Sequence, residues 1–482
     1  MNETNPWGFH PTGFGIEPGM SYFLTKNRIM NYLKSINPYS GEMIREYREF
    51  SDEHIAAAID RSYHAFSSFR STSCNHRAEL MLEMATRLKE DARKYGELIT
   101  TEMGKPIGEA VEEVEKCAWV CKYYARHAGG FLTGRREETD ASESYIRYEP
   151  LGPVLAIMPW NFPFWQVFRF TAPALMAGNT VLLKHASNTQ GCAHAIEELV
   201  NESGFPGEVF INLVIGSPRV KKVIVHPAVQ AVTLTGSEAA GRSVASLAGE
   251  NLKKTVLELG GSNAFVVLDD ADLEHAIDTA IKARLQNGGQ SCIAAKRFIL
   301  TPGIYESFVS MLQERLKKML PGDPMDPETW LGPLSSEKQA RDVEDQVVRS
   351  TEQGAELLMG GKRDGTFFEP TMVTGVEPGM AVFDEEVFGP VFAIARADSP
   401  EHALELSNRS VFGLGVQVFS RSDQHAALFI KEAREGSVFI NDMVKSDPRL
   451  PFGGIKHSGY GRELSEEGIR EFVNIKTIYK KS

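Results

Sequence analysis

Cys292 is the residue of this sequence best placed for covalent chemistry. It ends the segment 286–292, which reads QNGGQSC, so two glycines come shortly before the thiol. Glycine lets the backbone approach a ligand closely, and the segment is too polar and Gly-rich for a core strand. We therefore expect Cys292 to be a functional cysteine close to a ligand rather than a core residue. Free cysteines are more often buried as small hydrophobes, which is our expectation for Cys74, Cys117, Cys121 and Cys192.

Glu258 is a candidate general base. It lies in the apolar segment 255–261, which reads TVLELGG. Burial of a carboxylate without a partner is costly, and desolvation raises its pKa toward neutrality, as a general base requires. A structural glutamate in a salt bridge would explain the same pattern, so both interpretations stay open for this residue taken alone.

Three further candidate segments each follow a short apolar run. They are PWNFP at 159–163, KHAS at 184–187 and TGS at 235–237. Parallel α/β sheets bind ligands at the carboxyl ends of their strands. The segment TGS precedes a predicted helix, whose first N–H groups favour phosphate, although most such turns only begin a helix.

The elements that must position these residues are strands and helices in alternation. From residue 151 onward, apolar runs alternate with helix-like segments, which predicts parallel, doubly wound sheets. The pattern divides near 258–261 into two α/β blocks. Before it, residues 51–128 predict three helices, with the second at 76–103 and the third at 108–128, stopped by glycines. The expected strands are 154–158, 181–183, 209–214, 231–234, 256–259, 264–268, 298–300, 392–395, 416–419 and 438–440.

Length and composition describe a large globular protein. The chain has 482 residues, enough for about three domains, or two and an appendage. Its net charge of −12 argues against nucleic acid or an anionic membrane surface as a partner. Five sparse cysteines predict a reducing, cytoplasmic location. Residues 1–29 have loop-like composition and are either a true extension or precede a start at Met20 or Met30.

Six motifs, in order, resemble those of the NAD(P)-dependent aldehyde dehydrogenase superfamily over about residues 31–482. They are PWNFP at 159–163, TGS at 235–237, LELGG at 257–261, GQSC at 289–292, EVFGP at 386–390 and PFGG at 451–454. Within the superfamily the chain is most similar to bacterial succinate-semialdehyde dehydrogenases. The segments WNFPFWQVFR at 160–169, KHASN at 184–188 and AAKRFI at 294–299 carry that closer match.

The resemblance implies an α/β fold with two doubly wound parallel-sheet domains and a small β oligomerisation flap. The implied parts are an N-terminal extension (1–29), a cofactor-binding domain (30–130 and 150–257), a catalytic domain (258–450) and the flap (131–149 and 465–482). Exposed strand edges of this kind pair with other chains, so a homodimer or homotetramer is expected.

The resemblance also implies a mechanism without a metal. Cys292 attacks the aldehyde, and the Asn161 side chain and the Cys292 backbone N–H hold the oxyanion. Hydride transfer leaves a thioester, which a water activated by Glu258 hydrolyses. A thiol with an ordinary pKa is mostly protonated at neutral pH, so the site must lower that pKa or supply a base.

For the cofactor, the resemblance implies that Lys184 contacts the adenosine ribose or its phosphate, Ser237 faces the pyrophosphate, and Glu386 holds the nicotinamide ribose. Ser187 stands where NAD-preferring members often have Glu, so NADP is expected, with NAD as the weaker alternative. His185 is either a contact or a spacer. The implied cofactor site consists of Pro159, Trp160, Lys184, Ser187, Gly236, Ser237, Glu386 and Phe388.

For the substrate, the resemblance places Arg169 where related enzymes bind a carboxylate. Gln286 stands where some relatives have a second Arg, and Ser446 is a further donor. Three aromatic residues either wall a narrow pocket or pack a helix, namely Phe162, Trp165 and Phe168. The expected substrate is succinate semialdehyde. Glutarate semialdehyde or an aliphatic aldehyde, a cysteine hydrolase, and a non-catalytic scaffold are the alternatives.

Overall fold

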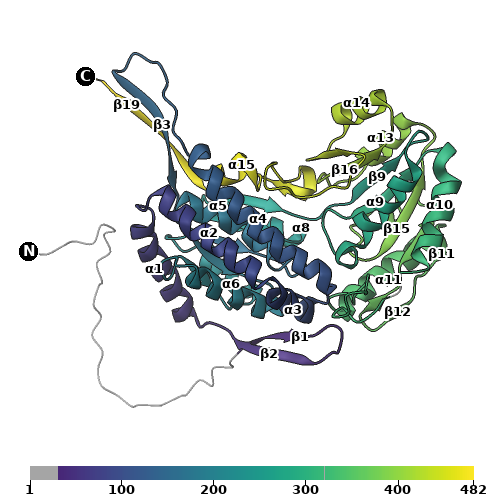
Figure 1. Ribbon diagram of the computed structural model, residues 1–482, viewed down its shortest axis with the longest axis horizontal. Coiled ribbons are helices and arrows are strands. Elements are labelled where there is room, and N and C mark those ends of the chain that lie inside the picture. Colours follow the sequence, from purple (N-terminus) through teal and green to yellow (C-terminus); the bar gives the residue numbers. More distant parts are fainter. Residues whose placement is uncertain (1–30, 320, 482) are drawn as a thin grey trace, which may run out of the picture. The chain divides into compact units, whose positions relative to one another are not determined.

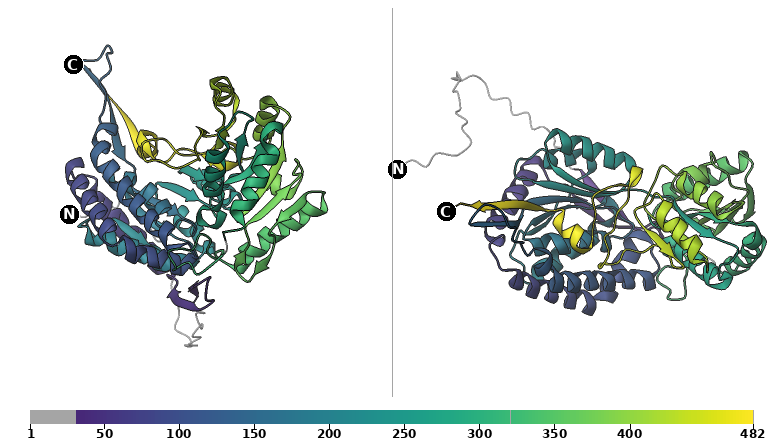
Figure 2. Two further views of the ribbon diagram at one scale, coloured as in Figure 1. Left: turned by 45° about the vertical axis from the view of Figure 1, so that its right-hand side comes forward. Right: turned by 90° about the horizontal axis from the view of Figure 1, so that it is seen from above.

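The computed structural model describes residues 31–319 and 321–481 (Figure 1). The predicted extension at 1–29 lies outside the described residues. Two parallel-stranded sheets, each flanked by helices, dominate the described chain (Figure 2). This arrangement confirms the predicted fold class.

The first sheet has the strand order β18-β8-β7-β4-β5-β6 and is parallel except for β18. Its strands are β4 (Pro153–Ile157), β5 (Thr180–Lys184), β6 (Phe210–Asn212), β7 (Ala231–Thr235), β8 (Lys254–Glu258) and β18 (Gly459–Tyr460). The chain crosses to β5 on one side of β4 and to β7 on the other, which makes β4 the switch point where a ligand crevice opens. The segment 159–163 therefore begins at that crevice.

The second sheet has the order β11-β14-β15-β10-β9-β16-β17, with only β11 antiparallel. Its strands are β9 (Asn263–Val267), β10 (Ala295–Leu300), β11 (Glu356–Met359), β14 (Thr371–Thr374), β15 (Val391–Arg396), β16 (Val416–Phe419) and β17 (Val438–Ile440). The short connection from β8 to β9 joins the two sheets, so Glu258 lies where they meet.

Helices surround these sheets. They are α1 (Asp52–Phe69), α2 (Cys74–Glu90), α3 (Ala92–Met103), α4 (Ile107–Phe131), α5 (Trp165–Ala177), α6 (Gln190–Glu202), α7 (Val220–Ile224), α8 (Glu238–Glu250), α9 (Leu273–Leu285), α10 (Pro302–Leu316), α11 (Glu337–Glu352), α12 (Ala381–Asp384), α13 (Pro400–Asn408), α14 (Asp423–Glu432) and α15 (Ser465–Arg470). Three small antiparallel pairs complete the described chain: β1 (Tyr32–Ile36) with β2 (Met43–Arg48), β12 (Arg363–Asp364) with β13 (Phe367–Phe368), and β3 (Glu143–Pro150) with β19 (Val473–Lys480).

Two helix boundaries differ from the prediction. The expected helix at 76–103 is two helices, α2 and α3, separated at Asp91. The pair Gly129-Gly130 does not end α4, which continues to Phe131. The two glycines keep a negative φ, and Phe131 stacks on His127 one turn earlier, so packing extends the helix past residues that usually stop one.

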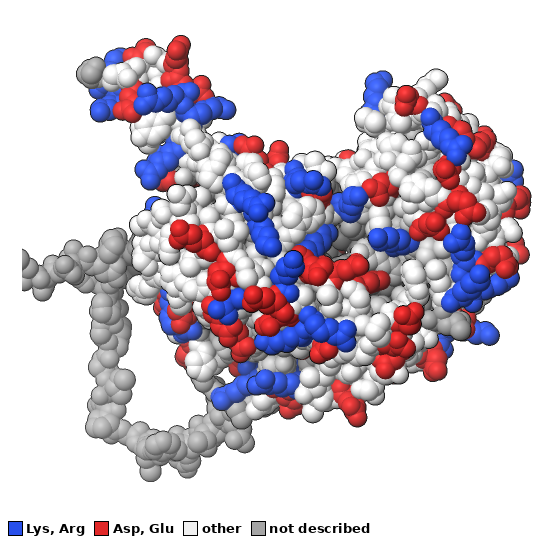
Figure 3. All heavy atoms as spheres, in the orientation of Figure 1, with Lys and Arg blue, Asp and Glu red and all other residues white. Residues whose placement is uncertain are grey.

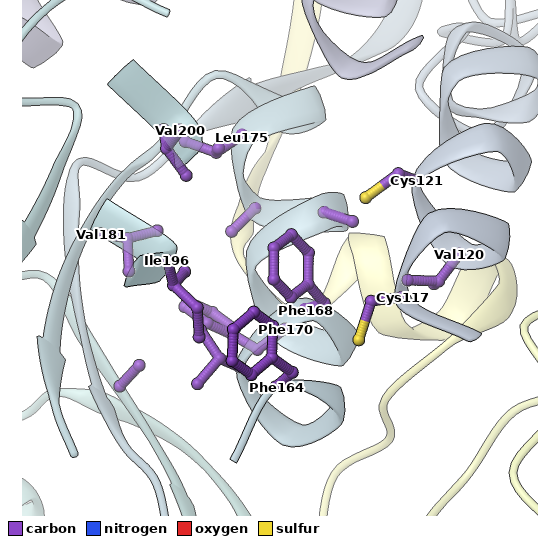
Figure 4. Packing of buried hydrophobic residues seen from close by; sticks show 14 of the residues in the cluster. Cys117, Val120, Cys121, Phe164, Phe168, Phe170, Leu175, Val181, Ile196 and Val200 are labelled. Atoms are coloured by element: carbon purple, nitrogen blue, oxygen red, sulfur yellow. The ribbon is translucent and has the colours of Figure 1, made fainter. Parts of the chain in front are cut away.

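The largest core lies between α4, α5 and the first sheet (Figure 4). Phe168 of α5 is fully buried there and stacks on Phe164, with Cys117 and Cys121 of α4 in the same cluster. Phe168 is therefore a packing residue rather than a pocket wall. The expectation of buried cysteines is confirmed for Cys117, Cys121 and Cys192, while Cys74 is half-buried.

Replacement of Phe168 by Ala should lower the free energy of unfolding by about 3–5 kcal/mol, because it leaves a cavity in this core. Urea denaturation followed by circular dichroism measures the change. Val348, an exposed residue of α11, provides the control: Val348→Ala should shift the midpoint little. A Phe168→Ala variant as stable as the wild type would contradict the packing role.

Candidate functional site

The loop before Cys292 has an unusual backbone. The residues Asn287, Gly288 and Gly289 have φ values of +54°, +63° and +76°, a left-handed run between α9 and β10. A Cβ on Gly289 would lie 2.4 Å from the carbonyl oxygen of Gly389. Only glycine therefore allows this approach, and the loop directs the thiol between the two sheets.

Cys292 lies between two cavities that share it. One has a volume of about 150 Å³ and the other about 260 Å³. The smaller one includes Lys116, Phe162, Trp165, Arg169, Gln286, Ser446 and Phe452 in its lining. The larger one includes Pro159, Trp160, Asn161, Gly236, Ser237, Glu386 and Phe388. The predicted substrate residues and most of the predicted cofactor residues thus fall on opposite sides of the same thiol.

Burial raises the pKa of the Cys292 thiol to about 11, although the charges of Arg169 and Lys296 act in the opposite direction. Sequence analysis left two routes to a thiolate open: a lowered thiol pKa or a base. The protein alone does not lower this pKa. A base, or a positive charge brought by a ligand, must therefore assist the deprotonation.

Lys296, on β10, is a site residue that sequence reasoning missed. Its buried ammonium donates hydrogen bonds of 2.8 Å to the carbonyl oxygens of both Ser291 and Cys292, and it ion-pairs with Glu386 at 3.2 Å. One lysine therefore ties the nucleophile's backbone to a residue of the larger cavity. The available signal was a basic residue directly before the predicted strand 298–300 and four residues after Cys292.

Asn161 is held in place by two neighbours. Gln166 donates to its Oδ1 at 3.1 Å, and its Nδ2 donates to the carbonyl oxygen of Gln290 at 2.9 Å. Asn287 in turn donates to the Asn161 carbonyl at 2.7 Å. One hydrogen of the Asn161 amide remains without a partner among the described residues, which suits it to an oxyanion.

Glu258 ends β8 and is fully enclosed. Neither carboxylate oxygen has a hydrogen-bond partner in the described part of the chain. Burial raises its pKa well above the usual range, nearby Glu463 adds to this, and Arg169 and Arg462 oppose it. The ion pair here is Arg169 with Glu463, so Glu463 is the salt-bridged glutamate. Glu258 lines neither cavity as it stands.

The larger cavity has features that fit a dinucleotide. Ser237 caps α8, whose first N–H groups lie beside Gly236 at the cavity wall. Glu386 accepts a hydrogen bond from the Gly261 N–H at 3.0 Å, and a Cβ on Gly260 would lie 2.4 Å from its Oε2. Trp160 and Phe388 meet edge to face at 5.9 Å.

Lys184 ends β5, Ser187 lies three residues further on, and neither lines either of these two cavities. Lys184 is buried with no carboxylate within 4.0 Å among the described residues, and the exposed Ser187 hydroxyl makes no hydrogen bond there. Burial lowers the pKa of Lys184. His185 faces inward, with Nε2 2.9 Å from the Pro163 carbonyl oxygen, and burial lowers its pKa to about 4. His185 is therefore a neutral spacer.

The smaller cavity combines expected and unexpected residues. Arg169 lines it, but its Nε is paired with Glu463 and its guanidinium lies 4.6 Å from the Phe452 ring centre. Gln286 and Ser446 line it as expected. Lys116 of α4 was not foreseen, since it is 330 positions from Ser446, to which its Nζ donates at 2.9 Å.

The chain belongs to the aldehyde dehydrogenase family, whose model matches residues 24–478. It is 45% identical over 453 residues to "Succinate-semialdehyde dehydrogenase [NADP(+)] 1" of Mycobacterium tuberculosis (strain ATCC 25618 / H37Rv), covering 93% of this chain and 99% of the relative. A probable succinate-semialdehyde dehydrogenase [NADP(+)] of Synechocystis is also 45% identical, over 450 residues, with 93% and 99% covered. The crystal structure of succinic semialdehyde dehydrogenase from Streptococcus pyogenes in complex with NADP+ superposes with a TM-score of 0.91 at 41% identity, covering 93% and 100%.

The rate of Cys292 alkylation by iodoacetamide, without dinucleotide, should rise about tenfold per pH unit between about pH 7 and 9, because the thiolate fraction grows tenfold per unit below a pKa near 11. Mass spectrometry of the Cys292 peptide measures the rate. The Cys292→Ser variant is the control, because any alkylation that remains in it occurs at another cysteine such as the half-buried Cys74. A plateau below about pH 8 would show that the protein itself stabilises the thiolate.

Proposed function

We propose that the protein oxidises succinate semialdehyde to succinate with NADP+. The observation that carries the proposal is the shared thiol: Cys292 is reached from one cavity with cationic and hydroxyl donors and from another that fits a dinucleotide. The net reaction takes one aldehyde, one NADP+ and one water to one carboxylate, one NADPH and two protons. The named relatives and the crystallised neighbour support this choice of substrate and cofactor.

The residues of the chain divide the covalent work. The Cys292 thiolate forms a C–S bond with the aldehyde carbon, and the oxygen takes the negative charge of the broken C=O π bond. Asn161 donates to that oxyanion with the amide hydrogen that its neighbours leave free, and the Cys292 N–H donates with it. The oxyanion re-forms the carbonyl as the hydride leaves, which gives a thioester on Cys292. Bound NADP+ would supply the hydride acceptor and a positive charge near the thiol.

Glu258 is assigned to the second half of the reaction. Its high pKa and lack of hydrogen bonds suit a carboxylate that takes a proton from water near neutral pH. Attack of that water on the thioester carbon forms the acid and returns the electron pair of the C–S bond to sulfur. Because Glu258 lines neither cavity, its side chain must rotate toward Cys292 to do this.

The cofactor residues support NADP+ over NAD+. At the end of β5, Lys184 offers an ammonium without a carboxylate partner and Ser187 a hydroxyl without a hydrogen bond, within the part of the chain that the structure describes. No acidic side chain occupies position 187. A 2′-phosphate would find charge and a hydrogen-bond donor there. Gly236 and Ser237 would face the pyrophosphate, and Glu386 the nicotinamide ribose.

The domain roles and assembly are inferences of the same proposal. The first sheet would carry the cofactor and the second the nucleophile. We infer a homodimer or homotetramer assembled through β3 and β19, where Ile475 is 60% and Tyr479 50% exposed. Figure 3 shows acidic and basic side chains interspersed on the face in view. No helix among the described residues is both long and apolar enough to span a membrane. A cytoplasmic location stays a prediction.

Purified enzyme would be assayed with succinate semialdehyde and either NADP+ or NAD+, and the absorbance of the reduced dinucleotide would be followed. The rate with NADP+ should exceed the rate with NAD+. Cys292→Ser should abolish the signal. A faster reaction with NAD+ would contradict the cofactor assignment, and activity restricted to uncharged aldehydes would favour a general aldehyde dehydrogenase.

Ser187→Glu should raise the KM for NADP+ by more than about tenfold, because it places a carboxylate against the 2′-phosphate. The KM for NAD+, which lacks that phosphate, is the internal control and should not rise. Ser187→Ala removes only a donor and should cost less. Steady-state kinetics with both dinucleotides measure the shifts, and equal losses for both would remove Ser187 from the phosphate site.

A further inference from the structure

We propose that Lys116 binds the carboxylate of the substrate, together with Ser446, and so sets the specificity of the enzyme for a carboxylated aldehyde. This inference rests on the proposed function and names a residue for it that lies outside the six shared motifs. Its basis is the arrangement of charges and hydrogen-bond donors in the 150 Å³ cavity.

Among the described residues, Lys116 differs from Arg169, the other cation in the lining of this cavity, in having no ion-pair partner. Arg169 pairs with Glu463, Lys296 with Glu386, and Lys105 with Glu113. In the part of the chain that the structure describes, no carboxylate lies within 4.0 Å of the Lys116 Nζ. Its contacts are the Ser446 hydroxyl at 2.9 Å and the face of Trp165 at 4.3 Å.

Carboxylates around the cavity offset this charge only in part: Glu113 and Asp447 raise the pKa of Lys116, but by less than burial lowers it, and Asp447 is paired with Arg449. Glu113 pairs with Lys105 and accepts hydrogen bonds of 2.9 Å from the N–H groups of Phe164 and Trp165. Glu109 accepts from the Asn287 N–H at 2.6 Å, and burial raises its pKa to about 7. Glu112 is exposed.

The donors around Lys116 suit a carboxylate. The Ser446 oxygen accepts from both Lys116 and the Trp165 Nε1, at 2.9 and 3.0 Å, so its own hydrogen is free to donate. Two of the three Lys116 N–H groups also have no acceptor among the described residues. Three hydrogen atoms without an acceptor among the described residues, in a cavity whose lining also includes Cys292, match a short chain that carries both an aldehyde and a carboxylate.

A bound anion would also relieve an electrostatic cost. Burial lowers the pKa of Lys116 to about 8, and the charge of Arg169 adds to this. The group is still mostly protonated at neutral pH, and a carboxylate beside it would stabilise the charged form. The Lys116 ammonium thus supplies the positive charge that Gln286 lacks. It also supplies a charge that Arg169 does not have free, because Glu463 balances the Arg169 guanidinium.

The test compares two four-carbon aldehydes, succinate semialdehyde and uncharged butanal, in wild type, Lys116→Met and Lys116→Arg. Lys116→Met should raise the KM for succinate semialdehyde about 10- to 100-fold, as expected for loss of a hydrogen-bonded ion pair. The kcat should change little. The kcat/KM for butanal should stay within about threefold or rise, since the cavity becomes more apolar, and Lys116→Arg should restore most of the affinity.

Lys122→Met is the matched control, because Lys122 lies on the same helix but does not line the cavity. It should leave both substrates unaffected. Equal losses for both aldehydes in Lys116→Met would make Lys116 structural and overturn the inference, as would an unchanged KM for succinate semialdehyde. A wild-type enzyme that oxidises butanal but not succinate semialdehyde would instead overturn the proposed function, and this inference with it.

Discussion

The burial of the Cys292 thiol between two cavities is the constraint on which the rest of the site depends. A left-handed turn through Asn287, Gly288 and Gly289 places it there, and Lys296 fixes the backbone by binding the carbonyls of residues 291 and 292. Burial protects the thiol and raises its pKa to about 11. Burial therefore makes the nucleophile dependent on a base or on a bound cationic ligand.

Ion pairing decides which charges remain for ligands. Arg169 and Lys296 are buried cations, each with its own glutamate. Such pairing offsets the desolvation of both groups. It leaves Lys116 in the smaller cavity and Lys184 at the end of β5 as cations without a carboxylate within 4.0 Å among the described residues. Glu258 is a buried carboxyl group whose oxygens have no hydrogen-bond partner among the described residues. Under the proposed function, these three groups would bind the substrate carboxylate, the 2′-phosphate and the hydrolytic water, respectively.

The central strands and the motif residues of the site could be predicted from the sequence, because each depends on residues close together in the chain. Continuous apolar runs located the central strands, and the short motifs located Cys292, Asn161 and Glu386, because each contains its own turn or strand end. Lys116 could not be found this way, since its partner Ser446 is 330 positions away. The pairing of Arg169 with Glu463 is equally non-local. The extension of α4 past Gly129 depends on the packing of Phe131, which residue helix propensities do not predict.

The most direct test of the account is to trap the acyl enzyme. Glu258→Gln would be incubated with succinate semialdehyde and NADP+, and the digested protein examined by mass spectrometry. The account predicts a succinyl thioester on the Cys292 peptide, formed only when NADP+ is present, with little further turnover. An acyl group on another residue, or full turnover by this variant without any accumulated thioester, would contradict it.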